Sequence, residues 1–338
     1  MASRFQQFGN DLFTGARSVE FVGRRRLWLS ISAVLIIICI VIPVARGGFN
    51  WGIDFRGGSQ FQVAHTSSTS QAIATKAVHE VKPDAIVQVS VVNGDGVRVT
   101  TDQLSSSQTS EITQRLASGY RVEQSEITSS FIGPAWGADV SRKALQGLGV
   151  FLILAFIGMA LYFRTWKMSL SAIITLFHDL VFTAGVYAAT GFEITPATVI
   201  GFLTILGYSL YDTVVVFDKV RENTTEDRDK LSRTFGESVN LAVNQTLVRS
   251  INTAVIAALP VAGILFIGSF VLGAATLEDI SLSLFVGILI GTYSTVFVAA
   301  PLYAWMRQGE PEIGKHDRRV LAARAKAPVD TESVAATR

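Results

Sequence analysis

Long apolar runs recur six times in this chain of 338 residues, and they constrain its fold more than any other feature. Most of them approach the ~20 residues that an α-helix needs to cross the hydrocarbon core of a bilayer. We therefore expect six transmembrane helices. The runs lie near 27–44, 148–163, 170–189, 197–217, 251–267 and 281–303. With 49% hydrophobic and only 17% charged residues, the composition excludes an ordinary soluble enzyme.

The basic residues are unevenly distributed and predict the orientation of the chain. In a six-helix arrangement, Lys and Arg gather on one side, in an N-terminal arm (1–26), a short turn after the second run, a loop near 219–246 and a C-terminal tail (307–338). By the positive-inside rule this side is the cytoplasm, so we expect both termini there. The first helix (27–45) is expected to be an uncleaved signal anchor. The tail is charged and Ala-rich, and we expect it to be disordered.

The segment 46–143, between the first two helices, is long enough to fold as a domain on the opposite side of the membrane. Alternating patterns predict strands at 60–64, 85–92, 97–101 and 120–128, and helical spacing predicts helices at 70–81 and 103–117. The turn signal Asn93-Gly94-Asp95-Gly96 predicts a hairpin between the second and third strands. The order β-α-β-β-α-β is that of a ferredoxin-like α+β domain. The other five helices then follow within 144–306.

Ionisable residues inside apolar helices are the strongest candidates for function, because an Asp or Arg at the bilayer centre costs at least ~2.5–3.5 kcal/mol. Asp212 lies in the fourth run, and Tyr208 and Ser209 share its face, so we expect them to hydrogen-bond its carboxyl. Arg249 lies where the fifth run enters the membrane, and Thr253 follows one turn deeper. Because these two helices run in opposite directions, we expect Asp212 and Arg249 to form an ion pair.

Two interpretations of this pair remain open. In the first, Asp212 takes up and releases a proton, and the approach of Arg249 biases that step and with it the conformation of the bundle. In the second, the two buried charges only hold helices together. Asp179, which follows His178 in the third run, is a second candidate for proton transfer and has the same structural alternative.

Other kinds of chemistry have little support. The chain contains no Gly-x-x-x-x-Gly-Lys-Ser/Thr loop, so we expect no ATP hydrolysis within it. Its four histidines and one cysteine do not have the spacing of metal ligands, and no nucleophile elbow is present. We therefore expect neither an enzyme nor a bound cofactor or metal.

Three motifs together resemble the SecD/SecF family of bacterial protein-export membrane proteins, within the RND superfamily. They are Trp-Gly-Ile-Asp-Phe-Arg-Gly-Gly (51–58), Tyr-Asp-Thr-Val-Val-Val-Phe-Asp through Arg-Glu-Asn (211–223) and Asn-Gln-Thr through Arg-Ser-Ile-Asn-Thr (244–253). They stand just outside the first helix, in the fourth helix and in the fifth. The resemblance covers the chain from Arg24 to about Arg307.

The resemblance implies a multi-pass protein of the bacterial cytoplasmic membrane that forms half of an RND-type bundle and pairs with the six helices of SecD. It further implies that the pair uses the proton-motive force to promote late export of unfolded polypeptide through the SecYEG translocon. The family's membrane carboxylate corresponds to Asp212, and its arginine and threonine correspond to Arg249 and Thr253. Asp179 matches a common pattern in the third helix whose role is less defined.

The first motif also has a physical interpretation. Gly57 and Gly58 permit a tight turn or a close backbone approach where a strand begins, so we expect a conformational junction between the first helix and the outer domain. Asp54 and Arg56 are placed to pair across that junction.

Two rival functions remain open. One is an RND-like proton-coupled transporter of small molecules or lipids, although a single modest outer domain argues against a large efflux cavity. The other is a structural scaffold subunit of the translocon, in which the buried charges serve only packing. A neutral Asn at Asp212 separates the scaffold from a proton-coupled protein, because a scaffold tolerates it.

Overall fold

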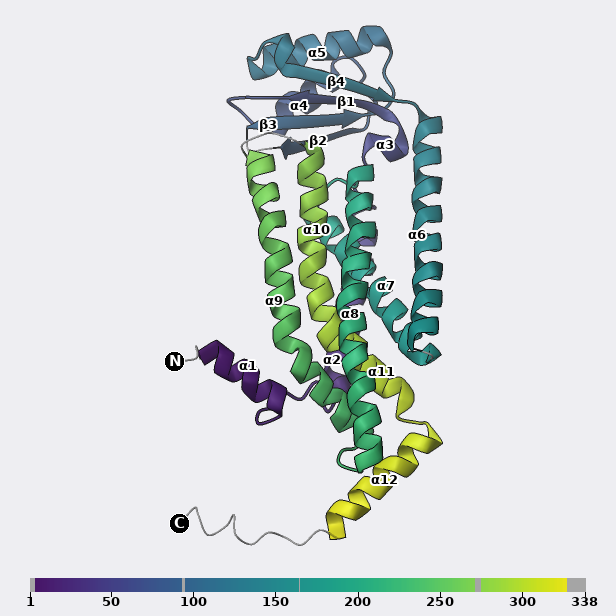
Figure 1. Ribbon diagram of the computed structural model, residues 1–338. Helices are drawn as coiled ribbons and strands as arrows, with labels where there is room; N and C mark the ends of the chain where they lie inside the picture. The colour runs from purple at the N-terminus through teal and green to yellow at the C-terminus, as the bar shows by residue number, and fades with distance from the viewer. Residues whose placement is uncertain (1–3, 93–94, 164, 271–274, 327–338) are drawn as a thin grey trace.

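The computed structural model describes residues 4–92, 95–163, 165–270 and 275–326. Within them, six helical segments are long and apolar enough to span a membrane, which confirms the six predicted spans. They are α2 (Arg25–Ala45), α6 (Pro134–Phe163), α7 (Trp166–Thr190), α8 (Pro196–Lys230), α9 (Phe235–Phe270), and a last span made of α10 (Ala275–Ser294), a π-helical turn (Thr295–Ala299) and α11 (Ala300–Arg307). Figure 1 shows them as an elongated bundle with a small domain at one end.

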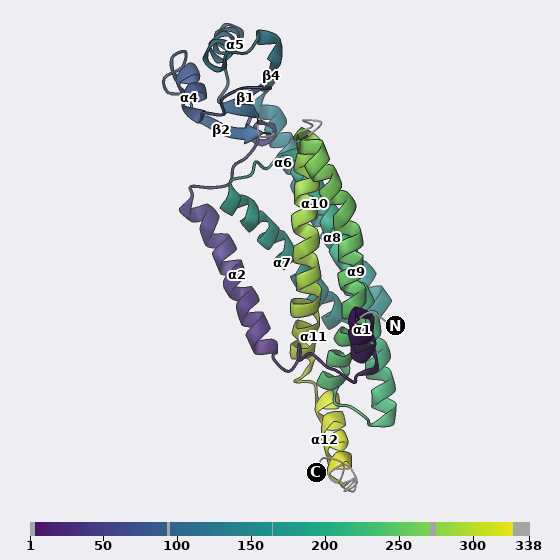
Figure 2. The same ribbon diagram turned by 90° about the vertical axis from the view of Figure 1, so that its left-hand side faces the viewer.

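Helix α10 packs against α7, α8 and α9, while α2 packs on α7 away from α9 (Figure 2). Small residues permit this close packing. A Cβ added to Gly287 would lie 2.4 Å from Ile205 Cγ1, and one added to Gly291 would lie 3.2 Å from Ser209 Cβ. The Gly-x-x-x-Gly spacing of α10 therefore brings it close to α8, as such steps do in membrane bundles.

The small domain contains a four-stranded antiparallel sheet with the order β2-β3-β1-β4. Its elements are β1 (Gly58–Val63), α4 (Gln71–His79), β2 (Val87–Val92), β3 (Gly96–Thr101), α5 (Ser106–Tyr120) and β4 (Ile127–Ile132), preceded by the short helix α3 (Ile53–Arg56). Val97 and Val99 of β3 join Phe61 and Val63 of β1 in a core that also contains buried residues of both helices. The register Val92↔Gly96 confirms the predicted pairing of β2 with β3, although 93–94 lie outside the described residues.

The last strand of this sheet begins later than predicted. Residues predicted as a strand at 120–128 begin instead with the end of α5, and β4 starts at Ile127. Ser105 and Gln108 form a capping box that starts α5, and the left-handed Arg121 (φ 59°) ends it. Tyr120 is buried as the last helical residue, and its hydroxyl donates to the Ser70 carbonyl oxygen at 2.8 Å.

Helices also extend beyond the apolar runs. Helix α6 begins at Pro134, inside the segment 46–143 that the sequence assigned to the outer domain, and α8 and α9 occupy most of the predicted loop near 219–246. Outside the apolar layer these extensions are tied by polar contacts: Asp227 accepts from Ser238 Oγ at 2.7 Å. The helices therefore continue past the ends of the apolar runs into charged sequence.

The predicted disorder of the tail (307–338) is wrong for 311–326, which form α12 (Pro311–Lys326), with Ile313 and Val320 buried. Residues 327–338 lie outside the described part of the chain. The N-terminal arm also contains a helix, α1 (Arg4–Thr14), which packs against α9. The segment after it is held by α9, since Asn240 Oδ1 accepts from the backbone amides of Phe21 and Val22.

Candidate functional site

Asp212 is buried between α8 and α9, with 5% of its surface exposed. Its Oδ1 accepts a hydrogen bond from Ser250 Oγ at 2.9 Å. Its Oδ2 is also buried and has no hydrogen-bond partner among the described residues. An ionised carboxylate buried with one oxygen unsatisfied is costly, so the neutral form is the cheaper one to hold here.

A second buried carboxylate, Asp179 of α7, faces α8 at a different level. Ser209 Oγ donates to its Oδ2 at 2.5 Å, and His178 Nδ1 lies 3.1 Å from its Oδ1. Ser209 was expected to bind Asp212, and this expectation is wrong because Ser209 faces α7. His178 Nε2 is buried without a partner among the described residues. Asp179 therefore has a hydroxyl group and an imidazole ring as its polar neighbours.

Hydroxyl groups that the sequence analysis did not single out complete this membrane cluster, which we define as His178, Asp179, Ser209, Asp212, Thr213, Ser250 and Thr295. Thr213 Oγ1 and Thr295 Oγ1 are 3.2 Å apart, and both residues are buried. Thr295 opens the π-helical turn between α10 and α11, a local widening that is common at functional sites. Ser and Thr within apolar runs are the signal that points to these residues.

Arg249 does not form the predicted ion pair with Asp212. Its Nη2 donates to Tyr211 Oη at 3.4 Å, and the residue is exposed on the outer face of α9. Successive helical residues are turned by about 100°, so when Ser250 faces Asp212, Arg249 is directed elsewhere. Thr253, one turn further along α9, is half-buried. In the described part of the chain, neither Asp212 nor Asp179 pairs with Lys or Arg.

The first motif forms a junction between the small domain and the bundle. The backbone amide of Gly52 donates to the Ile194 carbonyl at 2.9 Å, and the Ile194 amide donates to the Asn50 carbonyl at 2.8 Å. Ile194 belongs to the loop between α7 and α8, where Thr195 caps α8. The motif is therefore bonded directly to the end of two membrane helices.

A buried ion pair reinforces this junction. Arg98 Nη1 of β3 lies 2.8 Å from Glu193 Oε2, and each side chain is 8% exposed. Val97 and Val99 point into the domain core, so Arg98 between them points to the opposite face of the sheet, toward the bundle. Nearby, Thr195 Oγ1 donates to Asp279 Oδ2 of α10 at 2.9 Å. We call Asp54, Arg98, Glu193, Thr195 and Asp279 the junction cluster.

Asp54 and Arg56 do not pair with each other. Arg56 donates through Nε and Nη2 to the Trp51 carbonyl oxygen, at 3.1 and 2.8 Å, and through Nη2 to Gln88 Oε1. Asp54 is half-buried, and burial together with the nearby carboxylate of Glu193 raises its pKa above the ordinary value. Arg56 thus closes the α3 turn, while Asp54 belongs electrostatically to the junction cluster.

The two glycines of the motif have the backbone role that the sequence predicts. Gly57 and Gly58 have φ of 74° and 135°, a region that other residues rarely adopt. A Cβ on Gly58 would lie 2.4 Å from the Thr101 carbonyl oxygen of β3. Gly58 therefore allows β1 to begin in close contact with the end of β3.

Known proteins resemble this chain along most of its length. The family model described as "Protein export membrane protein SecD/SecF, C-terminal" matches residues 112–309, and the SecD/SecF GG motif matches residues 46–64. The chain is 44% identical to protein translocase subunit SecF of Streptomyces coelicolor, over 98% of this chain and 88% of that one. It is 40% identical to protein translocase subunit SecF of Mycobacterium tuberculosis, over 94% and 73% of the respective chains.

A solved structure shares the fold. The crystal structure of SecDF, a translocon-associated membrane protein from Thermus thermophilus, superposes with a TM-score of 0.73 at 29% identity over 86% of this chain. The matched part is 39% of that SecDF chain.

Proposed function

The chain belongs to the SecD/SecF family of protein export membrane proteins, and from this premise we propose that it is the SecF-type half of a two-part bundle that pairs with SecD. In this proposal the assembled bundle uses the proton-motive force to promote late steps of protein export through SecYEG. The match to one part of a longer SecDF chain supports the pairing with SecD, since the matched part makes up 39% of that chain.

One observation carries the proton-coupling part of the proposal: Asp212 is buried with an oxygen that no described group satisfies. A group that must be neutral to stay buried, and that ionises when a cation or water reaches it, can link proton transfer to a change in packing. One charge moving through 100 mV supplies ~2.3 kcal/mol, enough to bias a two-state bundle.

The residues exposed on the outer face of α9 indicate that a partner protein packs beside Asp212. Arg249 and Asn252 are exposed on it within the membrane-spanning segment, where contact with lipid is costly. Ile256 and Leu259 on the same helix are 71% and 66% exposed. We propose that this face, which we call the α9 face, packs against SecD. Assembly then shields Arg249, and a small shift of α9 brings its guanidinium toward Asp212.

We assign the small domain to the ferredoxin-like fold and to the outer side of the cytoplasmic membrane, with both termini in the cytoplasm. The basic loops support the orientation, and the sheet order supports the fold. In both views of the ribbon, β2 lies nearer the bundle and β4 farther from it. We propose that an exported polypeptide adds as a strand to the β4 edge, where Ser129, Ser130 and Phe131 are exposed.

Export measured in membrane vesicles that contain SecD tests this proposal. Asp212→Asn is expected to abolish the stimulation of export by the proton-motive force, and Asp212→Glu to retain part of it. The matched control is Asp218→Asn, because Asp218 lies on the same helix and is exposed; it is expected to behave as the parent. Co-purification with SecD verifies assembly of each variant.

If assembled Asp212→Asn is stimulated as strongly as the parent, the proton role is wrong and the buried carboxylate serves packing, as in the scaffold interpretation. The same vesicles test polypeptide capture. A photo-crosslinker at Ser129 of β4 is expected to label a stalled substrate, and one at Ser90 of β2 is not. Equal labelling at both positions would contradict capture at the β4 edge.

A further inference from the structure

A cavity of about 490 Å³ lies at the end of the bundle opposite the small domain. Phe163, Thr165 and Met168 form one wall, α8 and the start of α9 form others, and α11 and α12 close it. None of the three sequence motifs accounts for this hollow, apart from Arg221 at the end of the second one.

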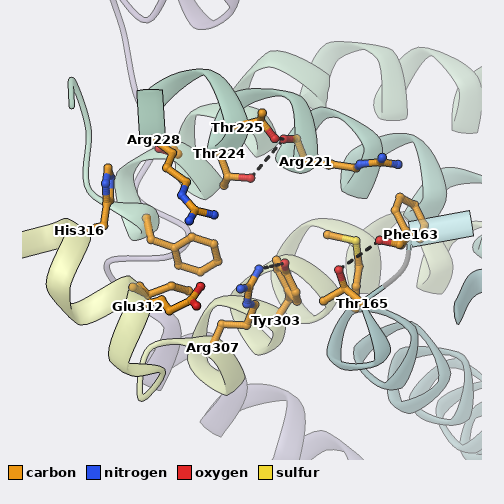
Figure 3. A pocket seen from close by; sticks show the side chains of 14 residues that line it. Phe163, Thr165, Arg221, Thr224, Thr225, Arg228, Tyr303, Arg307, Glu312 and His316 are labelled. Carbon is orange, nitrogen blue, oxygen red and sulfur yellow. Dashed lines mark hydrogen bonds between the residues drawn. The ribbon is translucent and has the colours of Figure 1, made fainter. Parts of the chain in front are cut away.

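The cavity is basic. Figure 3 shows Arg228 and Arg307 entering from opposite walls, while Arg221 extends along α8 toward Phe163. Arg307 is already bonded, to Tyr303 Oη at 2.9 Å and to Glu310 Oε2 at 2.7 Å. Arg221 and Arg228 are exposed, and their guanidinium groups form no ion pair with any residue that the structure describes. Seven residues apart on one helix, they lie two turns apart on the same face.

The charge of the cavity is not cancelled by its acidic lining. Glu312 is the acidic residue among those that line it, against three arginines. Glu310 lies outside the lining and is shared between Arg307 and Lys167, at 2.7 and 2.9 Å. A ligand that approaches Arg221 and Arg228 therefore meets two guanidinium groups that bond to no other described side chain, which suits the oxygens of a phosphate group.

Part of the remaining wall is apolar, and hydroxyl groups of Ser and Thr lie beside it. Phe163 ends one membrane-spanning helix and Thr165 precedes the next, so we expect this part of the cavity to lie at the level of the lipid headgroups. Met168, Phe235 and Ile313 are buried residues that contribute apolar surface to the same hollow. A small soluble anion gains nothing from contact with apolar surface, whereas an amphiphile with an anionic headgroup contacts both the basic and the apolar residues.

We propose that this cavity binds the phosphate headgroup of an anionic phospholipid from the leaflet at this end of the bundle. Arg221 and Arg228 pair with the phosphate oxygens, and the apolar wall contacts the glycerol and the first methylene groups. The bound lipid joins the turn after α6 to α8 and α12. This site is independent of the proposed export function, because it is formed by this chain alone and its occupancy is measured without export.

Binding to the full-length protein in detergent tests this site, with thermal unfolding and native mass spectrometry as readouts. The probes are a short-chain phosphatidylglycerol, the matching phosphatidylcholine, and glycerol phosphate as a soluble source of the same headgroup chemistry. Phosphatidylglycerol is expected to raise Tm saturably and to remain bound, with at least tenfold lower affinity in Arg221→Gln/Arg228→Gln. The matched control is Lys315→Gln/Arg319→Gln, which removes two exposed charges from α12 outside the cavity lining and is expected to bind like the parent.

Each other outcome overturns the proposal. Equal binding of phosphatidylglycerol and phosphatidylcholine, or equal losses in the two double variants, would show only general attraction to lipid or charge. Saturable binding of glycerol phosphate as tight as that of the lipid would assign the site to a soluble phosphate. If the arginine variant has a lower Tm without ligand, Thr224→Val with both arginines retained replaces it in the binding measurement. Because Thr224 lies between the two arginines in the lining, a bound headgroup contacts it, and unchanged affinity in this variant then contradicts the site.

Discussion

The membrane cluster and the junction cluster are both buried and both rich in carboxylates, but only one of them contains an arginine. At the junction, Arg98 is paired with Glu193 at 2.8 Å, and Asp279 lies near it. In the membrane, Asp212 and Asp179 have hydroxyl and imidazole neighbours and no Lys or Arg pair among the described residues. The compensated cluster is suited to holding two parts of the molecule together, and the uncompensated one to changing its charge.

The largest effect that separates the two clusters is expected from neutralising one carboxylate in each. Glu193→Gln leaves Arg98 buried without its charge partner and should destabilise the junction by about 3 kcal/mol, the lower end for a broken buried pair, because Asp279 remains nearby. Asp212→Asn leaves no buried cation behind and should change local stability by less than about 1 kcal/mol. Hydrogen exchange at the amides of Gly52 and Ile194, and along α8 and α9, measures both.

The control for this comparison is Asp139→Asn, which breaks the exposed pair between Asp139 and Arg142 and should change stability by no more than about 0.5 kcal/mol. Replacing both Arg98 and Glu193 by Met should recover most of what Glu193→Gln loses, since no buried charge remains. If Glu193→Gln and Asp212→Asn destabilise their surroundings equally, the distinction between the clusters is wrong.

A smaller effect is expected at the backbone of the junction. Gly58→Ala should destabilise the start of β1 by about 2 kcal/mol, because it combines a strained φ with overlap against the Thr101 carbonyl oxygen. Gly47→Ala separates these causes: φ there is 80°, but nothing lies within 4 Å of an added Cβ. It should cost about 1 kcal/mol. Exchange rates in β1 and β3 of the full chain report the difference, and equal losses would mean that the close approach to β3 contributes nothing.

The smallest expected effect is a pH dependence of the stability of the junction, caused by Asp54. Its pKa is raised in the folded protein, so the folded state holds a proton that the unfolded state releases. Stability of the junction is then greatest below the ordinary Asp pKa of about 4 and falls as pH rises through the raised value. Asp54→Asn should remove this slope from the exchange of the Gly52 amide, and a slope that survives in the variant would assign the pH dependence to another group.

The parts of the fold that could be predicted are those that depend on local sequence. The six helices could be predicted because a long apolar run is decisive by itself. The β-α-β-β-α-β order could be predicted because strands and helices differ in the period of their hydrophobic residues. The start of β4 could not, since the capping of α5 and the burial of Tyr120 moved the boundary. The prediction of a disordered tail failed for a related reason: Ile313 and Val320 are buried by neighbours that no local pattern reveals.

At the membrane site, the sequence indicated Asp212 and Asp179 as costly groups, and both are buried. The sequence could not show which carboxylate Ser209 binds. Ser209 lies near Asp212 on its own helix and Asp179 on α7, and the rotation of α7 against α8 determines which of them it contacts. The sequence also could not tell Arg249 from Ser250 as the residue that faces Asp212, since one step along a helix decides it. The pattern supplied the residue types, and tertiary packing determined the pairs.

Infrared difference spectroscopy of the reconstituted complex with SecD tests most directly whether Asp212 carries a proton. If Asp212 is protonated, a carboxylic-acid signal at neutral pH is present in the parent and in Asp218→Asn and is lost in Asp212→Asn. A parent spectrum that matches that of Asp212→Asn in this region would show that the buried carboxyl is ionised throughout, which would contradict the account.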